Sequence, residues 1–215
     1  MYVLRVQIQA LPGKAAEFEK RAESFNQFIV QQQGCLRVST LASLGYVGQY
    51  EGLASFTDAQ AAKTCLRGPW AEWLEKNPVN DVLTLRAPTE AWEIVQTSLQ
   101  TASPSGSFFA SAQVTIDPTQ AAAYEASRKE LLALFDREAR GLVGAALGRF
   151  CGGGGRYVLA SVYTNRDDAE RTLQAPAIQA FLQANPASKF GAVAAPEITF
   201  SEVVHSRVAA AVAQR

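Results

Sequence analysis

Histidine is almost absent from this chain: its 215 residues include only one, His205. The three cysteines, Cys35, Cys65 and Cys151, are an odd number, and none stands at the short paired spacing of zinc-binding or thiol-exchange motifs. The sequence therefore predicts no metal site and no bound cofactor. We expect the three thiols to be free and buried or half-buried.

An excess of charge of either sign is also missing. The 20 Lys and Arg residues balance the 20 Asp and Glu residues and form no basic cluster, which argues against nucleic acid as a partner. No apolar run reaches membrane-spanning length, and the first residues follow a strand pattern instead of a signal-peptide pattern. With 48% hydrophobic and 19% charged residues, the composition predicts a globular protein, which we place in the cytoplasm without membrane association.

The chain contains an internal repeat. Matching positions lie 106 to 109 residues apart (118 − 12 = 106; 202 − 93 = 109), as in Pro12 and Pro118, Tyr50 and Tyr157, Asn77 and Asn185, and Glu93 and Glu202. This small drift is typical of loop-length changes between duplicated units. The sequence thus predicts two domains at 1–97 and 108–206, a linker at 98–107 rich in small residues, and a C-terminal tail at 207–215.

Hydrophobic periodicity predicts the elements of one repeat. In the first copy we expect a strand at 2–10, a helix at 14–33, a hairpin of strands at 35–43 and 49–56, a helix at 59–75 broken at Gly68-Pro69, and a strand at 91–97. The order β-α-β-β-α-β, present twice, is the ferredoxin-like α+β arrangement, with both helices on one face of an antiparallel sheet.

The open face of such a sheet must be covered or solvated. Two linked copies can pack their antiparallel sheets on one another, so we expect an internal pseudo-dimer. In the first strand the polar alternates Arg5, Gln7 and Gln9 would face the space between the sheets. A further homodimer through an outer strand edge stays open.

A set of local features resembles a known family. The strand Tyr50–Phe56 ends in an aromatic residue, Asp58-Ala59 starts the next helix, and Trp70 and Trp73 follow on it. This combination resembles the antibiotic biosynthesis monooxygenase-like, dimeric α/β-barrel superfamily, over both repeats. The resemblance implies sheet-to-sheet pairing and a small aromatic ligand. The family includes cofactor-independent oxygenases of aromatic polyketides or quinols, haem-degrading enzymes, and members without assigned activity.

The resemblance also implies where a ligand would bind. In that family the pocket lies between the helices and the sheet of each unit. The implied lining residues are Phe56, Trp70 and Trp73 in the first copy, and Tyr163, Ile178 and Phe181 in the second. Polar groups expected to reach such a pocket are Arg37, Tyr50 and Glu93. The histidine that family members often carry on the second helix is missing, which removes a haem ligand and a general base, so the catalytic residues are unknown.

Three other features of the sequence could be mistaken for functional sites. We expect His205 to have a surface or strand-end role, since no second histidine or carboxylate cluster accompanies it. Glu93 and Glu202 stand at matching strand positions and are either a pair of acid/base groups or edge residues of the sheet. As an edge residue, Glu93 would form a salt bridge with Arg5 or Arg37. The run Gly152–Gly155 predicts a hairpin turn, because no helix with Lys-Ser/Thr follows it as in a phosphate-binding loop.

The sequence is compatible with two functions. One is a cofactor-independent monooxygenase-like protein that acts on a small aromatic, quinol- or polyketide-like substrate. The other is a non-catalytic small-molecule-binding or stress-related module of the same fold, in which the tryptophans only fill the core. A cavity in the first repeat would favour the first function, and solid packing there would favour the second.

Overall fold

The computed structural model of the protein describes residues 1–99 and 106–210, and it divides the chain into two compact units. Unit 1 holds Met1–Glu93 and the segment that begins at Ser201, and unit 2 holds Ile94–Phe200. The division falls within the last strand of each repeat. Each unit therefore consists of most of one repeat. It lacks part of the last strand of that repeat and includes part of the last strand of the other repeat instead.

The expected linker and tail lie partly outside the described residues, which leave out 100–105 and 211–215. β5 (Glu90–Leu99) includes the first two residues of the expected linker. β9 (Glu197–Val208) includes the first two residues of the expected tail, and Arg207 and Val208 pair there with β2.

Unit 1 has the predicted order of elements, with one additional strand. Its complete elements are β1 (Tyr2–Ala10), α1 (Ala15–Ile29), β2 (Cys35–Ser43), β3 (Gln49–Phe56), α2 (Ala59–Arg67), α3 (Pro69–Lys76) and β4 (Leu83–Arg86). The short strand β4 was not predicted, because its alternation of apolar and polar residues covers only four positions. It forms through pairing with β1.

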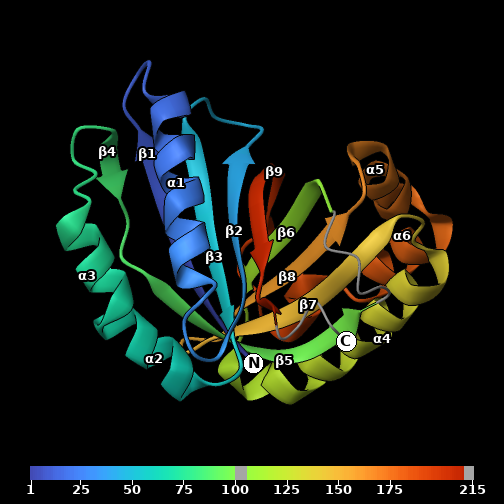
Figure 1. Ribbon diagram of the computed structural model, residues 1–215. Coiled ribbons are helices and arrows are strands. Elements are labelled where there is room, and N and C mark those ends of the chain that lie inside the picture. The colour runs from blue at the N-terminus through green and yellow to red at the C-terminus, as the bar shows by residue number, and fades with distance from the viewer. Residues whose placement is uncertain (100–105, 211–215) are drawn as a thin grey trace. The chain divides into compact units, whose positions relative to one another are not determined.

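The sheet of unit 1 is antiparallel, with β3 between β1 and β2. On its other side β1 pairs with β5 and with β4, while β2 pairs with β9. Helices α1, α2 and α3 lie on one face of this sheet (Figure 1). The buried side chains between helices and sheet include Leu4, Val6, Ile29, Val38 and Phe56.

The local sequence explains where the helices of unit 1 end. Helix α1 stops at Ile29, four residues before the predicted end, because the chain tightens into turns before Gly34. Gly34 has a φ of 76°, and a Cβ there would lie 2.6 Å from the Cβ of Ala61, so only glycine fits. The Asp58 carboxylate accepts a hydrogen bond from the Ala61 N–H and caps α2. Gly68-Pro69 separates α2 from α3, as predicted.

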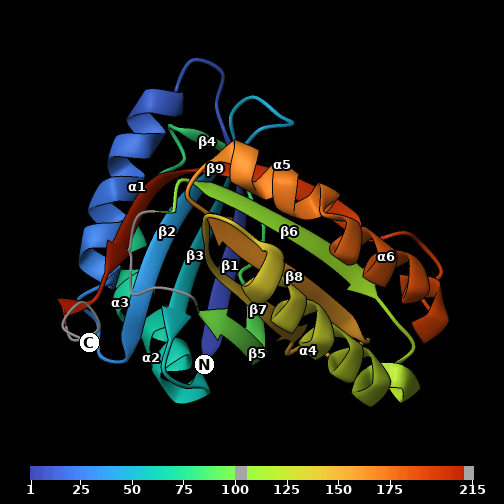
Figure 2. The same ribbon diagram turned by 90° about the vertical axis from the view of Figure 1, so that its right-hand side faces the viewer.

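Unit 2 repeats this plan. Its complete elements are β6 (Phe108–Thr115), the 3₁₀ turn η1 (Pro118–Gln120), α4 (Ala121–Glu138), β7 (Leu142–Phe150), β8 (Arg156–Tyr163), α5 (Arg166–Gln174), α6 (Pro176–Ala184) and the 3₁₀ turn η2 (Ala187–Phe190). Strand β8 pairs antiparallel with β6 and β7, β9 lies beside β6, and β5 lies beside β7. Helices α4, α5 and α6 pack on these strands (Figure 2). Gly152–Gly155 forms the predicted turn between β7 and β8.

No helix among the described residues is long and apolar enough to cross a membrane.

Candidate functional site

Unit 1 contains a cavity of about 70 Å³ between its helices and its sheet. The aromatic wall is formed by Phe25 of α1 and by Trp70 and Trp73 of α3, and Val6 and Ile8 of β1 form part of the floor. The space is large enough for several water molecules or for part of a small organic molecule. Its lining is almost entirely apolar, as is usual for small-molecule sites.

The aromatic wall has a defined geometry. The ring of Phe25 meets Trp70 at a centroid distance of 4.7 Å and an interplanar angle of 78°, and it meets Trp73 at 5.1 Å and 73°. Such edge-to-face contacts hold the three rings against one another. Trp70 is buried and Trp73 is half-buried, so the wall extends from the core towards the surface.

Two small residues leave the space open. Ala22 of α1 and Gly52 of β3 both line the cavity. A Cβ placed on Gly52 would lie 3.0 Å from Cγ1 of Val6 and 4.0 Å from Cδ1 of Ile8, so any side chain there would extend over the floor. The cavity therefore depends on the absence of side-chain atoms at these two positions.

Few polar side chains reach the cavity. Inside it, Asn26 Nδ2 donates a buried hydrogen bond of 3.0 Å to Thr40 Oγ1, which ties α1 to β2. Among the described residues that line the cavity there is no Asp, Glu, His, Lys, Tyr or Cys. The lining thus supplies no ordinary proton acceptor.

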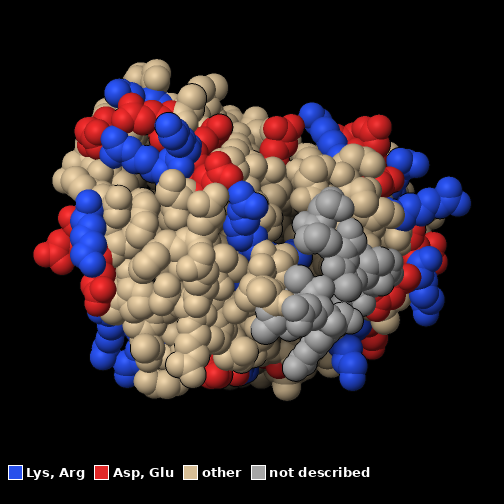
Figure 3. Space-filling view, in the orientation of Figure 1, with Lys and Arg blue, Asp and Glu red and all other residues tan. Residues whose placement is uncertain are grey.

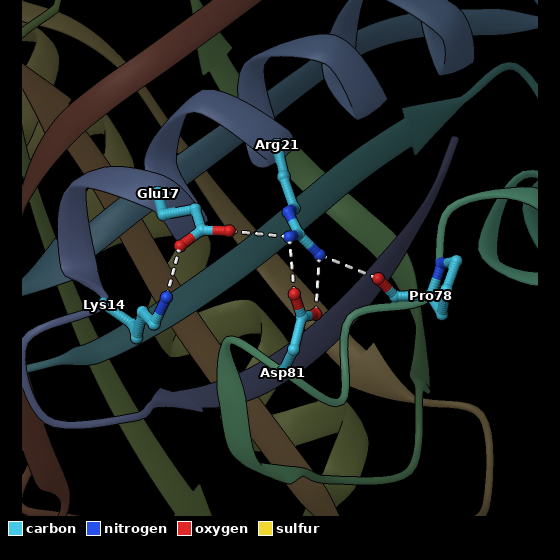
Figure 4. Close-up of polar contacts among 5 residues, drawn as sticks. All are labelled: Lys14, Glu17, Arg21, Pro78 and Asp81. Carbon is cyan, nitrogen blue, oxygen red and sulfur yellow. Dashed lines mark hydrogen bonds and ion pairs between the residues drawn. The ribbon is translucent and has the colours of Figure 1, made fainter.

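An ion-pair network lies at the rim, between α1 and the loop that follows α3 (Figure 4). The guanidinium of Arg21 donates two hydrogen bonds of 2.7 Å to the carboxylate of Asp81, one of 2.8 Å to the Pro78 carbonyl, and one of 2.7 Å to Glu17. Lys14 also donates to Glu17, over 2.7 Å. Figure 3 shows acidic and basic side chains intermixed over the start of α1. The network joins α1 to the loop and has no net charge.

The network shifts the titration of its members. Hydrogen bonds from Arg21 lower the pKa of the Asp81 carboxyl, and those from Lys14 and then Arg21 lower the pKa of Glu17. Both carboxylates therefore stay ionised to a lower pH than usual.

A second arginine, Arg86 of β4, also lines the cavity. Its side chain is exposed at the rim, yet partial burial lowers its pKa. The register pairs Arg86 with Ile8, another lining residue.

Another arginine of the unit 1 sheet is neutralised within the chain. Arg5 is 5% exposed, forms a bidentate pair of 2.7 and 3.0 Å with Glu51, and lies 3.7 Å from Glu90. A second cavity of about 140 Å³ adjoins Arg5, Gln7 and Glu90. The sequence had suggested Arg5 or Arg37 as a bridge to Glu93; the carboxylates next to Arg5 belong to Glu51 and Glu90.

Unit 2 fills the corresponding space with side chains. The position of Gly52 is taken by Leu159, which pairs with β6 and β7 as Gly52 pairs with β1 and β2. The position of Ala22 on α1 is taken by Arg128 on α4, because the two helices start 106 residues apart (121 − 15).

Arg128 is 6% exposed and makes its contacts within unit 2. It donates a hydrogen bond of 2.9 Å to the Asn185 carbonyl, and its guanidinium lies 4.9 to 5.9 Å from the ring centres of Tyr124, Phe181 and Phe190. Burial lowers its pKa. Arg128 and Leu159 thus occupy the volume that is open in unit 1.

The structure brings together two of the eight residues expected to bind substrate, Trp70 and Trp73. Phe56 is fully buried in the neighbouring core, and Tyr50 donates a hydrogen bond of 2.7 Å to Glu19. Glu93 lies in β5 and is half-buried, and Arg37 of β2 is half-buried with a pKa lowered by burial. No sequence pattern indicated a site role for Ala22, Gly52 or Arg86, which line the cavity.

In the second copy, Phe181 contacts Arg128, whereas Tyr163 is fully buried in the core of unit 2. Burial also raises the pKa of Tyr163. Neither residue lines the cavity of unit 1.

His205, for which a surface or strand-end role was expected, is half-buried and stands close to the end of its strand. It lies within β9, opposite Thr40, and its Nε2 atom is buried and makes no hydrogen bond. The isolated position of the chain's one histidine gives no second ligand for a metal. No group of three or more His, Cys, Asp or Glu side chains in the described part of the chain could hold a metal ion.

Comparison with known families supports the resemblance drawn from the sequence. Residues 1–69 match the family model of the antibiotic biosynthesis monooxygenase domain, which confirms that resemblance in the first repeat. No curated protein matches the chain significantly.

Solved structures with the same fold span nearly the whole chain. A proposed monooxygenase from Lactobacillus acidophilus is 11% identical, with a TM-score of 0.74, and covers 96% of both chains. A proposed monooxygenase from Fusobacterium nucleatum is 12% identical, with a TM-score of 0.76, and covers 96% of this chain and 94% of its own. An anthrone oxidase-like protein is 14% identical, with a TM-score of 0.64 and coverages of 97% and 93%. At these identities the likeness establishes the fold alone: the predicted duplicated ferredoxin-like α+β unit is confirmed.

Proposed function

We propose that the chain is a cofactor-independent monooxygenase-like protein that binds a small aromatic, quinol- or polyketide-like molecule in the cavity of unit 1. The observation that carries the proposal is the aromatic wall of Phe25, Trp70 and Trp73 beside an open, apolar space. The family match over residues 1–69 covers β1, α1, β2, β3 and α2 of this unit and ends just before Trp70. Similar structures described as monooxygenases and as anthrone oxidase-like support the reaction class.

The wall suits a flat aromatic ligand. Edge-to-face packing of Phe25 against both tryptophans leaves ring surfaces in the lining, and aromatic surfaces pair best with other rings. The apolar floor of Val6, Ile8 and Leu83 would exclude water from a bound ring. The protein contributes binding, orientation and a dry environment.

The proposed reaction balances without a cofactor. Oxidation of an anthrone-type CH₂ group to a carbonyl consumes one O₂ and releases one water, and the substrate supplies all four electrons. The substrate must first lose a proton. No lining residue is an ordinary base, so we assign no catalytic residue and expect substrates acidic enough to ionise in solution.

The second repeat has a structural role in this proposal. Arg128 and Leu159 fill the volume that corresponds to the cavity, so we expect one ligand per chain, bound in unit 1. The duplicated ancestor would have had two equivalent sites, and duplication frees one of them to be filled.

A second candidate is a non-catalytic binding or stress-related module of the same fold. The absence of an acid or base from the described lining residues favours it over any reaction that needs proton transfer by the protein. The two candidates share the ligand site and differ in turnover.

Tryptophan fluorescence tests the site, and oxygen uptake tests the reaction. The purified protein is titrated with 1,4-dihydroxynaphthalene and with anthrone, as wild type and as Trp73→Phe, with Trp92→Phe as the control outside the cavity lining. We expect saturable quenching that weakens in Trp73→Phe and persists in Trp92→Phe. An oxygen electrode then measures uptake above the uncatalysed rate. Binding without uptake would support the non-catalytic module, and no quenching would contradict the ligand site.

A further inference from the structure

We propose that the ligand of the unit 1 cavity carries an acidic group, a carboxylate or an ionised phenol, which pairs with the guanidinium of Arg86. This inference rests on the proposed function, since it concerns the same site. It specifies the substrate class as an aromatic acid or acidic phenol instead of a neutral aromatic compound.

The register of the sheet directs Arg86 to the cavity. Arg86 of β4 pairs directly with Ile8 of β1. Residues directly opposite in an antiparallel pair project to the same face, and Ile8 lines the cavity floor. The Arg86 side chain therefore lies on the helix-covered face, where it also lines the cavity. Leu85, its neighbour in β4, is 62% exposed and absent from the lining.

Arg86 differs from the other arginine of the rim in its partners. Arg21 binds Asp81 and Glu17, so its charge is neutralised within the chain. Among the described residues, no carboxylate lies within ion-pair distance of Arg86. The rim thus carries one uncompensated positive charge, in contact with the apolar cavity.

The environment of Arg86 strengthens an interaction with an anion. Partial burial disfavours its charged form, yet an arginine keeps its proton at any physiological pH. A cation that has lost part of its hydration gains more from an anionic partner than a fully solvated one. The planar guanidinium also offers paired donors that match a carboxylate.

Arg5, another arginine of the same sheet, shows the alternative arrangement. Arg5 is buried and is held in a bidentate pair with Glu51. At Arg5 the unit supplies an internal anion. At Arg86 that anion is missing, and the open space beside it is the place where a ligand could supply one.

Pairing with Arg86 would also assist the proposed chemistry. A cation near a phenol or enol favours its ionised form, and the ionised form is the one that gives electrons to oxygen. The aromatic body would lie against Trp70 and Trp73 while its acidic group reaches the rim.

A matched pair of ligands tests the inference by isothermal titration calorimetry. 2-Naphthoate carries the acidic group, and 2-naphthamide has nearly the same shape without the charge. The variants are Arg86→Gln and the control Arg67→Gln, an exposed arginine at the end of α2 that does not line the cavity. Circular dichroism checks that each variant is folded.

We expect wild type and Arg67→Gln to bind 2-naphthoate about tenfold more tightly than 2-naphthamide, as one good charge-assisted contact would provide. In Arg86→Gln the preference disappears because only the naphthoate affinity falls. Equal affinities for both compounds in wild type, or a preference retained in Arg86→Gln, would overturn the role of Arg86 and leave the aromatic site intact. If neither compound binds wild type, both this inference and the proposed site are wrong.

Discussion

Gly52 and Leu159 occupy the same place in the sheets of their respective units. Gly52 pairs with Val6 on one side and Thr40 on the other, and Leu159 pairs with Ala112 and Leu147 in the same register (159 − 52 = 107). The glycine leaves a cavity between helices and sheet, and the leucine packs into the core of unit 2. The residue at this one position therefore distinguishes the unit with a cavity from the unit whose core is filled.

Replacing Gly52 by leucine should close the cavity. The added side chain would extend from a Cβ position already 3.0 Å from Val6, so we expect at least a tenfold loss of affinity for 1,4-dihydroxynaphthalene. Overpacking costs about 1–3 kcal/mol, which a thermal melt would detect as a modest shift. Gly45→Leu is the control, because a Cβ at Gly45 meets nothing within 4 Å. Unchanged affinity in a folded Gly52→Leu variant would show that the ligand binds elsewhere.

Shortening Arg128 to alanine should open space in unit 2. Loss of its buried packing and of its hydrogen bond to Asn185 should lower the free energy of unfolding by about 2–4 kcal/mol. Calorimetry with 2-naphthamide should then give a stoichiometry that rises from one towards two. Lys129→Ala, an exposed neighbour on α4, should change neither quantity. A folded Arg128→Ala variant that still binds one ligand would contradict the view that this arginine fills a former site.

The Arg21–Asp81 pair should make unit 1 sensitive to acid. Because folding lowers the pKa of Asp81, its stabilising effect is present above the usual carboxyl pKa, about 3.9, and is lost as the pH falls through the lower folded value. Melting temperatures between pH 2.5 and pH 7, about the range of carboxylate titration, should show wild type above Asp81→Asn near neutrality and equal to it at the acid end. Glu75→Gln serves as the control, since Glu75 is exposed and has no ion pair among the described contacts. If the melting temperatures of wild type and Asp81→Asn differed by the same amount at all pH values, titration of Asp81 would be excluded as the cause of the acid sensitivity.

The thiols should react at very different rates. Burial raises the pKa of Cys35 to about 12 and that of Cys65 to about 11, whereas Cys151 is exposed. Since the thiolate is the reactive form, an aromatic disulfide reagent at about pH 8, near the ordinary thiol pKa, should modify one thiol quickly in the folded protein and all three in denaturant. Cys151→Ser should abolish the fast phase. A fast phase that survives in this variant would mean that Cys35 or Cys65 becomes accessible through opening of unit 1.

Much of the fold was predictable because its signals are local. The bounds of β1, β2 and β3 agree with the predicted strands, since alternation of polar and apolar residues reports a strand with two different faces. Gly68-Pro69 marked the break between α2 and α3, and the nearly constant spacing of matching positions indicated a duplicated unit. β4 was missed because the alternation in Leu83–Arg86 covers only four residues, and the strand forms through its pairing with β1.

The candidate site was only partly predictable, for a physical reason. Trp70 and Trp73 were found because large aromatic residues at helical spacing stand out in a sequence. Ala22 and Gly52 were missed because they contribute by having few atoms, and a cavity is set by what surrounds an empty volume. Arg86 was missed because its place beside Ile8 follows from strand pairing across the unit.

The sequence by itself determined the duplication, the order of elements in each repeat and the family resemblance, because periodicity and turn residues act over a few positions along the chain. Only the tertiary structure decided that unit 1 has a cavity while Arg128 and Leu159 fill unit 2. It also decided that β9 pairs with β2 and that Arg86 lacks a carboxylate partner among the described residues. These features depend on atoms far apart in the sequence, whose packing and charge balance exist only once the chain has folded.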